Sequence, residues 1–291
     1  MARMPAAKPD DEDDFAKLHE RGKLHRVERP DGAEAYAVDT PFVPRPPLPG
    51  EVHAVLGADQ AIDAATADLV VQAGGCVRAF GDFHIALSGD PALAPLYERL
   101  MYDPNCRGLP WVKTHLWIVD ERCVPFDDAE SSFRLVRETI VDHSDIPPEQ
   151  VHPIFAMGDD PAAAYEATLR ETLAWREKGQ DRLDFVMLAL APDGSTAGLL
   201  PGSPLLRDRH LVGRDARGRG TGASATDRIS MTPTLINAAR CIAVYACGAG
   251  CADAVRRLVA GREPLDELPV KAIHPVGGAL RWYLDAEAVG G

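Results

Sequence analysis

The stretch F-H-I-A-L-S-G-D-P-A-L-A-P-L-Y, residues 83–97, decides the class of fold. Its first five residues form a short, largely apolar run, which is typical of a β-strand covered on both faces. Asp90 and Pro91 follow as a helix N-cap and a proline at the first helical position. The stretch therefore predicts a buried strand, a short Ser-Gly loop and the start of a helix.

The same order of elements recurs along the chain. Four further apolar runs are predicted strands: 52–56, 115–120, 185–190 and 241–246. Apolar residues at helical spacing lie between them: Ile62, Ala65 and Leu69, then Tyr165, Leu169 and Leu173. This alternation predicts an α/β fold, with a mostly parallel sheet and helices on both faces. Ligands bind such folds at the carboxyl ends of strands, so we expect a site in the loops after Leu87, Val119 and Leu190.

Composition limits the classes of partner. The 291 residues carry a net charge of -13, which argues against a nucleic-acid or anionic-membrane surface. A phosphorylated substrate would need a locally positive pocket. We see no signal peptide and no run of the roughly 18–20 apolar residues that a membrane span needs, so we expect a cytoplasmic protein.

The cysteine pattern predicts thiols and no metal centre. None of the six cysteines forms a C-x-x-C pair, and most lie in apolar surroundings, which favours buried free thiols in a reducing compartment. No His/Cys cluster shows the ligand spacing of a metal site. His84, His115, His143 and His152 lie at the ends of predicted elements, and we interpret them as structural.

Two segments differ from the rest. Residues 1–50 contain an acidic run at 10–14 and the proline-rich P-F-V-P-R-P-P-L-P-G at 41–50. We interpret 1–50 as an N-terminal extension that could contact a protein partner, and 51–291 as the folded domain. The Gly/Arg-rich stretch 214–224 is either a mobile surface loop or a lid that grips phosphate.

Five motifs follow one another after residue 50. They are A-L-S-G-D-P-A-L-A-P-L-Y (86–97), W-I-V-D-E-R-C-V-P (117–125), L-A-P-D-G-S-T-A-G-L-L-P-G (190–202), R-I-S-M-T-P-T-L-I-N-A-A-R (228–240) and L-P-V-K-A-I-H-P-V-G-G-A-L-R-W-Y-L-D (268–285). In this order they resemble the 6-phosphogluconolactonase family. The related amino-sugar-phosphate isomerases have a D-E-Y-like second motif. Arg122, together with the L-L-P-G that ends the third motif, favours the lactonase branch.

The resemblance implies a NagB/RpiA-like, Rossmann-like fold. It also implies hydrolysis of 6-phosphogluconolactone in the pentose phosphate pathway, without metal or cofactor, on a phosphosugar lactone as substrate. The implied substrate-binding residues are Ser88, Gly89, Asp90, Asp120, Glu121, Arg122, Gly194, Thr196 and Arg228. The implied catalytic positions are Asp193 and Ser195, where Ser195 stands in the place of the family's histidine.

Several residues depart from the family pattern. Ser195 cannot act as a general base near neutral pH without a base of its own. Asp90 and Pro91 replace a glycine and a serine of the first loop, and Cys251 stands where a lysine is expected. Ser132 replaces a common asparagine. A carboxylate about 4 Å from a phosphate charge repels it by roughly 4 kcal/mol at an effective dielectric constant near 20.

The roles of these residues stay open at the level of sequence. Asp90 and Pro91 predict either a helix that caps itself or a changed site for a neutral or cationic ligand. Asp120–Arg122 is a site element or a structural salt-bridge cluster, Asp193 a weak base or a turn former, and Arg228 a phosphate or sheet-edge contact.

Three functions therefore remain. The chain is a lactonase with impaired activity, a catalytically silent relative that acts as a binding or regulatory protein, or a hydrolase or binder for a less anionic sugar.

The departures predict weak phosphosugar binding. Calorimetric titration with 6-phosphogluconate should give a dissociation constant above the micromolar range, because Asp90 repels the phosphate and the lysine charge is lost at Cys251. Micromolar affinity at physiological salt would contradict this expectation.

Overall fold

The computed structural model describes residues 24–28, 34–38, 42–216 and 226–290. The chain divides into two compact units, 1–42 and 43–291. In the first unit, β1 (Leu24–Glu28) and β2 (Glu34–Val38) form an antiparallel hairpin that pairs Leu24 with Val38. The acidic run at 10–14, and residues 217–224 of the Gly/Arg-rich stretch, lie outside the described residues.

The proline-rich residues 43–50 are part of the second unit. Val43 and Leu48 are buried, and the indole Nε1 of Trp282 donates a 2.8 Å hydrogen bond to the carbonyl of Pro49. This segment therefore packs on the folded unit as a strap. The compact units divide after residue 42. The functional boundary that we expected at residue 50 stays a prediction.

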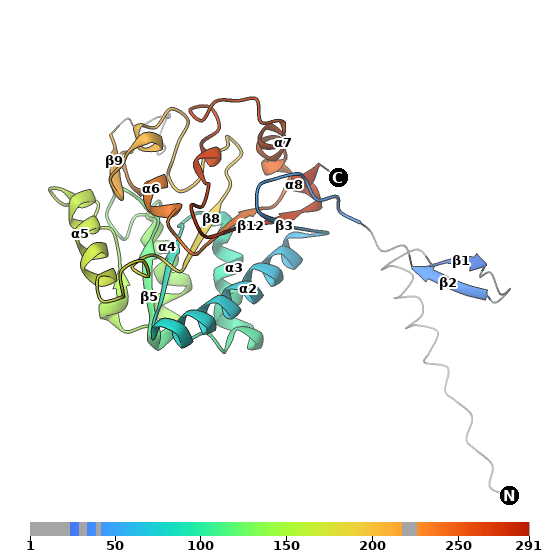
Figure 1. Cartoon of the computed structure of the whole chain (residues 1–291), viewed down its shortest axis with the longest axis horizontal. Coiled ribbons are helices and arrows are strands. Elements are labelled where there is room, and N and C mark those ends of the chain that lie inside the picture. The colour runs from blue at the N-terminus through green and yellow to red at the C-terminus, as the bar shows by residue number, and fades with distance from the viewer. Residues whose placement is uncertain (1–23, 29–33, 39–41, 217–225, 291) are drawn as a thin grey trace, which may run out of the picture. The chain divides into compact units, whose positions relative to one another are not determined.

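A seven-stranded sheet forms the centre of the second unit (Figure 1). Its order is β3-β12-β11-β8-β4-β5-β7, and every neighbouring pair is parallel. The strands are β3 (Glu51–Val55), β4 (Phe83–Leu87), β5 (Thr114–Ile118), β7 (Val151–His152), β8 (Phe185–Ala189), β11 (Cys241–Ala246) and β12 (Ala279–Asp285). The predicted parallel α/β sheet is confirmed, with β4 and β11 at the bounds that we expected.

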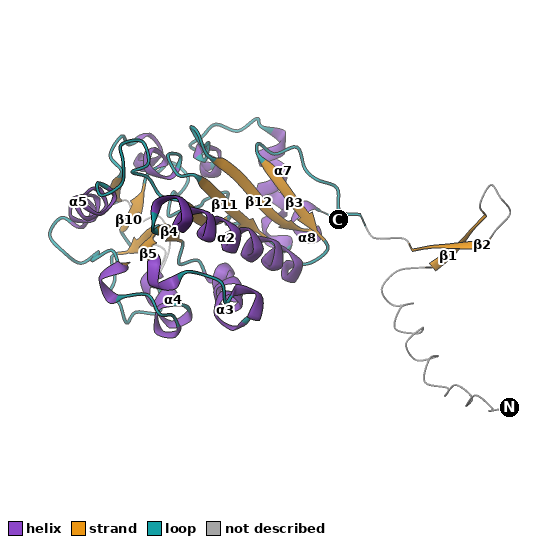
Figure 2. Cartoon of the chain, turned by 60° about the horizontal axis from the view of Figure 1, so that its bottom comes forward, coloured by secondary structure: helices purple, strands orange, loops and turns teal. Residues whose placement is uncertain are grey.

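Helices cover both faces of this sheet, as expected from the sequence. They are α2 (Ala58–Phe80), α3 (Ala94–Tyr102), α4 (Ser132–Thr139), α5 (Pro161–Leu173), α6 (Pro233–Ile236), α7 (Ala252–Ala260) and α8 (Ala286–Val289). The crossover through α2 runs from β3 toward β4, and the crossover through α7 runs the opposite way, from β11 to β12. Right-handed crossovers place helices of opposite direction on opposite faces, and Figure 2 shows α2 in front of the strands. Among the described residues, no helix has the length and apolar character needed to cross a membrane.

A second, smaller sheet lies after β5 in the chain. It joins β6 (Asp120–Arg122), β10 (Arg228–Met231) and β9 (Val212–Asp215) in antiparallel order. The amide of Met231 donates to the carbonyl of Val119, which ties this sheet to the segment that follows β5. The register sets Arg228 directly opposite Arg122.

The Gly277-Gly278 pair in the fifth motif predicts a turn directly before the last helix, but the segment after it is the strand β12, and α8 follows only after that strand. Gly278 is needed because a Cβ there would lie 2.1 Å from the carbonyl oxygen of Ala239. The segment after Gly278 pairs with β3 on one side and β11 on the other, and this pairing makes it a strand.

Three neighbouring strands, β4, β5 and β7, carry a row of imidazoles. The rings of His84 and His115 stack with centroids 4.5 Å apart, and His115 Nδ1 lies 3.1 Å from His152 Nε2. Burial, and then the neighbouring His84, lower the pKa of His115 from 6.5 to about 4; Asp82 opposes this shift and Arg176 adds to it. Burial, and then His115 and His84, lower the pKa of His152 to about 3.

These pKa values predict an acid-sensitive fold. Between pH 6.5 and about 4 the unfolded chain binds protons that the folded histidines exclude, so the free energy of unfolding should fall as the pH drops through this window. Each histidine changes the free energy of unfolding by at most about 1.4 kcal/mol per pH unit. Urea unfolding between pH 7.5 and 5 should show a shallower loss in His152→Gln than in the unchanged chain. His274→Gln, at an exposed histidine away from this row, is the control and should leave the slope unchanged.

Candidate functional site

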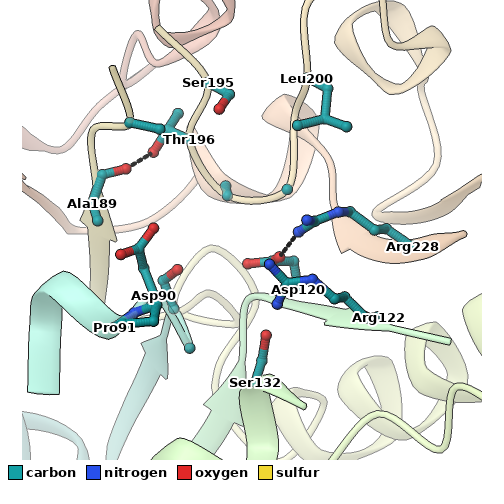
Figure 3. Close-up of a pocket in the computed structure, with 15 residues that line it drawn as sticks. Asp90, Pro91, Asp120, Arg122, Ser132, Ala189, Ser195, Thr196, Leu200 and Arg228 are labelled. Atoms are coloured by element: carbon teal, nitrogen blue, oxygen red, sulfur yellow. Dashed lines mark hydrogen bonds and ion pairs between the residues drawn. The ribbon is translucent and has the colours of Figure 1, made fainter. Parts of the chain in front are cut away.

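A cavity of about 170 Å³ lies where the loops after β4 and β8 meet β6 (Figure 3). Its lining comes from all three loops that the sequence singled out, and from β10 and the start of α4. The lining residues are Ser88, Gly89, Asp90, Pro91, Asp120, Arg122, Ser132, Ala189, Ala191, Ser195, Thr196, Ala197, Gly198, Leu200 and Arg228. The expected convergence of these loops on one cleft is confirmed.

The first loop leads from β4 into a helical turn over Pro91–Leu93 that continues into α3. Asp90 Oδ1 accepts a 2.9 Å hydrogen bond from the amide of Ala92, and Pro91 occupies the first helical position. The interpretation that this helix start caps itself is confirmed. Gly89 has no room for a side chain, because a Cβ there would lie 2.2 Å from Cα of Ser132. The first loop is therefore packed against the start of α4.

Two guanidinium groups from β6 and β10 line the same cavity. Arg228 Nη1 lies 3.3 Å from Asp120 Oδ2, and Arg122 Nη1 donates to the carbonyl of Glu130 at 2.8 Å. Both arginines line the cavity, so their guanidinium groups give this wall a positive charge that suits an anion or a polar ligand.

Asp120 is a buried carboxylate between these charges. Its residue is 5% exposed, and burial raises the pKa of its carboxyl group while Arg228 and Arg122 lower it. Asp90 raises it further, which places the Asp90 charge within electrostatic reach. Figure 3 shows Arg228 extended toward Asp120, with Arg122 beside them.

Glu121 lies outside the cavity lining. It is fully buried and accepts hydrogen bonds from the amides of Ser132 (2.7 Å) and Phe133 (2.8 Å) and from the hydroxyl of Ser131 (3.0 Å). Burial raises the pKa of Glu121, and the bonds from these amides oppose that effect. Its carboxylate thus caps α4, and the expected contact of Glu121 with a substrate finds no support in this arrangement.

The third loop divides the remaining candidates. Ser195 and Thr196 line the cavity, whereas Asp193 and Gly194 do not. Asp193 Oδ1 accepts from the amide of Ser195 at 2.9 Å and from its hydroxyl at 2.6 Å, so Asp193 acts here as a turn former. Thr196 Oγ1 donates to the carbonyl of Ala189, and Gly194 adopts a positive φ of 87°.

The described cavity lining contains no histidine, lysine or cysteine. Cys251, at the position of the expected lysine, is buried, and its thiol donates to the carbonyl of Leu190 at 3.2 Å. Burial, followed by the charges of Asp285 and Asp90, raises the pKa of Cys251 to about 11. The described lining therefore has two cations and two carboxylates, and no group with the acid–base range of an imidazole.

Sequence reasoning missed the wall that Ala197 and Gly198 build. Ala197 has a φ of 54°, the one positive φ among the described non-glycine residues. A Cβ at Gly198 would lie 2.8 Å from the Cβ of Asp120. The glycine in T-A-G-L is the one sequence signal for this close approach, which only the tertiary contact explains.

A metal is a separate question, because Asp82, His84 and His115 each place one potential ligand atom within 4.8 Å of the others. Spacing in the sequence gave no sign of this group. Trp117 Nε1 donates to His84 Nδ1 at 3.2 Å, so the proton of His84 lies on Nε2, which faces Asp82 Oδ2 at 3.2 Å. That nitrogen donates a hydrogen bond and offers no lone pair to a metal.

Breaking the buried ion pair should destabilise the chain strongly. Arg228→Gln leaves Asp120 buried without its cation, so we expect a loss of about 3 kcal/mol or more in the free energy of unfolding. In urea unfolding, the double variant Asp120→Asn/Arg228→Gln should regain part of the free energy of unfolding that Arg228→Gln alone loses. The control Arg134→Gln breaks an exposed pair with Glu138 and should cost far less. Equal losses of unfolding free energy in Arg228→Gln and Arg134→Gln would show that the buried Asp120–Arg228 pair stabilises the fold no more than an exposed pair does.

Comparisons with known proteins agree on one family. The model for "Glucosamine-6-phosphate isomerases/6-phosphogluconolactonase" matches residues 57–282. The chain is 34% identical over 242 residues to the GDH/6PGL endoplasmic bifunctional protein of Oryctolagus cuniculus, covering 79% of this chain and 29% of that protein. It is 32% identical over 248 residues to 6-phosphogluconolactonase of Rattus norvegicus, covering 83% and 93%.

Solved structures show the same fold. The 6-phosphogluconolactonase from Trypanosoma cruzi matches with a TM-score of 0.70 at 22% identity, over 84% of this chain and 97% of that chain. At this identity the likeness concerns the fold alone. The chain spans 29% of the length of the bifunctional relatives from Oryctolagus cuniculus and Homo sapiens.

Proposed function

The chain belongs to the glucosamine-6-phosphate isomerase/6-phosphogluconolactonase family, and on this premise we propose that it hydrolyses 6-phosphogluconolactone to 6-phosphogluconate at a reduced rate. Its relatives named 6-phosphogluconolactonase support a function of this type. The proposal assigns the cavity of Figure 3 to the substrate.

The observation that carries the proposal is the pair of guanidinium groups on one cavity wall. Arg122 and Arg228 lie opposite each other on β6 and β10, and both line the cavity. Two guanidinium groups side by side suit the oxygens of a phosphate. They supply the locally positive wall that an acidic chain needs in order to hold an anionic sugar.

The reduced rate follows from the rest of the lining. Ser195 occupies the place of an imidazole, and its hydroxyl donates to Asp193. A missing general base typically costs 10²–10⁴-fold in rate. Asp90 places a carboxylate in the same cavity, and this charge weakens the hold on a phosphate.

Two other functions have specific support. The Ser195–Asp193 hydrogen bond and the buried thiol of Cys251 favour a silent relative that binds a ligand without turning it over. Asp90 in the cavity favours a less anionic sugar. We place the slow lactonase first because both arginines remain at the cavity.

A cytoplasmic location is proposed on the state of the cysteines. All six are unpaired, and four of them are buried, which fits a reducing compartment. A protein partner for residues 1–50 stays a prediction, as does the absence of nucleic-acid binding.

A coupled lactonase assay, read as kcat/KM above spontaneous hydrolysis, tests the proposal. We expect measurable but low activity in the unchanged chain. Ser195→His alone should raise it by much less than 10²-fold, because a base helps only where the lactone is held in place.

The quadruple variant Asp90→Gly, Pro91→Ser, Ser195→His and Cys251→Lys should exceed the product of the four single effects, because grip and base act as a unit. Near-full activity from Ser195→His alone would refute the weak phosphate grip. Activity equal to the spontaneous rate in the unchanged chain would favour the silent relative.

A further inference from the structure

We propose that Asp90 is the general base that activates water in this cavity, in place of the missing imidazole. This inference rests on the proposed lactonase function and adds a catalytic residue to it. The described lining offers four ionisable side chains, namely Asp90, Asp120, Arg122 and Arg228. The two guanidinium groups cannot accept a proton, so the base is one of the two aspartates.

Asp120 is the poorer choice on geometry. It is 5% exposed, its Oδ2 lies 3.3 Å from Arg228 Nη1, and Gly198 packs against its side chain. Taking a proton there would weaken the ion pair that holds Arg228 in place. Asp90 is half-buried at the cavity and forms no ion pair among the described residues, so it can reach a water molecule without breaking a charge pair.

The position of Asp90 is fixed by its backbone neighbours. Oδ1 accepts from the amide of Ala92 at 2.9 Å, and Pro91 contributes no N–H to the helix start. Among the described residues this is the one hydrogen bond recorded for its carboxylate, so Oδ2 remains available to a water molecule in the cavity that Asp90 lines. One anchored oxygen and one available oxygen give the preorganisation that a base needs.

The step balances with groups at hand. A water oxygen attacks the lactone carbonyl carbon while its proton passes to Asp90 Oδ2. The tetrahedral intermediate then breaks the bond from the carbonyl carbon to the ring oxygen, and Asp90 returns the proton to that oxygen. The product is an open-chain hydroxy acid, which loses its carboxyl proton to solvent, and Asp90 ends as it began.

Asp90→Asn is the informative variant, because asparagine caps a helix as well as aspartate does and can still accept from Ala92. It removes both the base and the negative charge near the substrate phosphate. We therefore expect kcat to fall by about 10²-fold while KM for 6-phosphogluconolactone falls by about tenfold. A fall in kcat together with a fall in KM distinguishes a base beside the substrate from a residue that only shapes the loop.

Asp103→Asn is the matched control. Asp103 also precedes a proline at the first position of a helical turn, and its Oδ1 accepts from the amide of Asn105 at 2.8 Å, but it does not line the cavity. Both kcat and KM should be unchanged there.

Two further measurements use the full-length chain. In Asp90→Gly, added formate should restore part of kcat by acting as a free carboxylate base. In Asp103→Gly, the same formate should leave kcat unchanged, because Asp103 does not line the cavity.

The outcomes separate the two claims. If the unchanged chain does not exceed spontaneous hydrolysis, the lactonase proposal fails and this inference fails with it. If the unchanged chain is active but Asp90→Asn keeps its kcat, the lactonase stands and Asp90 is not the base. A lower KM with unchanged kcat would assign Asp90 to electrostatics alone and would also overturn the inference.

Discussion

The buried carboxylate of Glu121 is the interaction on which the site depends. A charge taken fully out of water must be matched by hydrogen bonds, and Glu121 meets this need with the first amides of α4 and the hydroxyl of Ser131. That bond set fixes α4 against β6. It also brings Ser132 to where only a glycine, Gly89, fits opposite it. Two loops far apart in the chain are thereby held as one wall.

The charges around the cavity show a compromise between stability and binding. Arg228 is paired with Asp120, and the negative charge of Asp120 weakens the attraction between Arg228 and an anionic ligand. Arg122 donates to the neutral carbonyl of Glu130 and lies beside the same carboxylate of Asp120. Asp90 lies on the same cavity, where its charge weakens an anion's binding but supplies a carboxylate close to the reacting group. In our proposal the same side chain acts on both the affinity for the substrate and the chemistry.

Polar residues at strand ends have different roles at the two ends of this sheet. The imidazoles of His84, His115 and His152 lie in the strands away from the cavity, stacked on each other and on Trp117. Their burial lowers the pKa of His115 and His152, which suits packing and not proton transfer at neutral pH. These three histidines therefore belong to the packing of the strands, apart from the cavity.

Local patterns in the sequence were enough for much of the fold and for part of the site. The strands β4 and β11 and the helix start capped by Asp90 depend on neighbours within a few residues. The meeting of the three loops also followed, because carboxyl ends of parallel strands share one edge.

Only the tertiary structure decided which side chains face the cavity. Glu121 turns to α4, Cys251 turns to the carbonyl of Leu190, and the strand β12 replaces an expected helix. The pairing of Arg122 with Arg228 depends on a register between segments about a hundred residues apart. Such contacts are set by burial and by hydrogen bonds between distant segments, and no local spacing in the sequence encodes them.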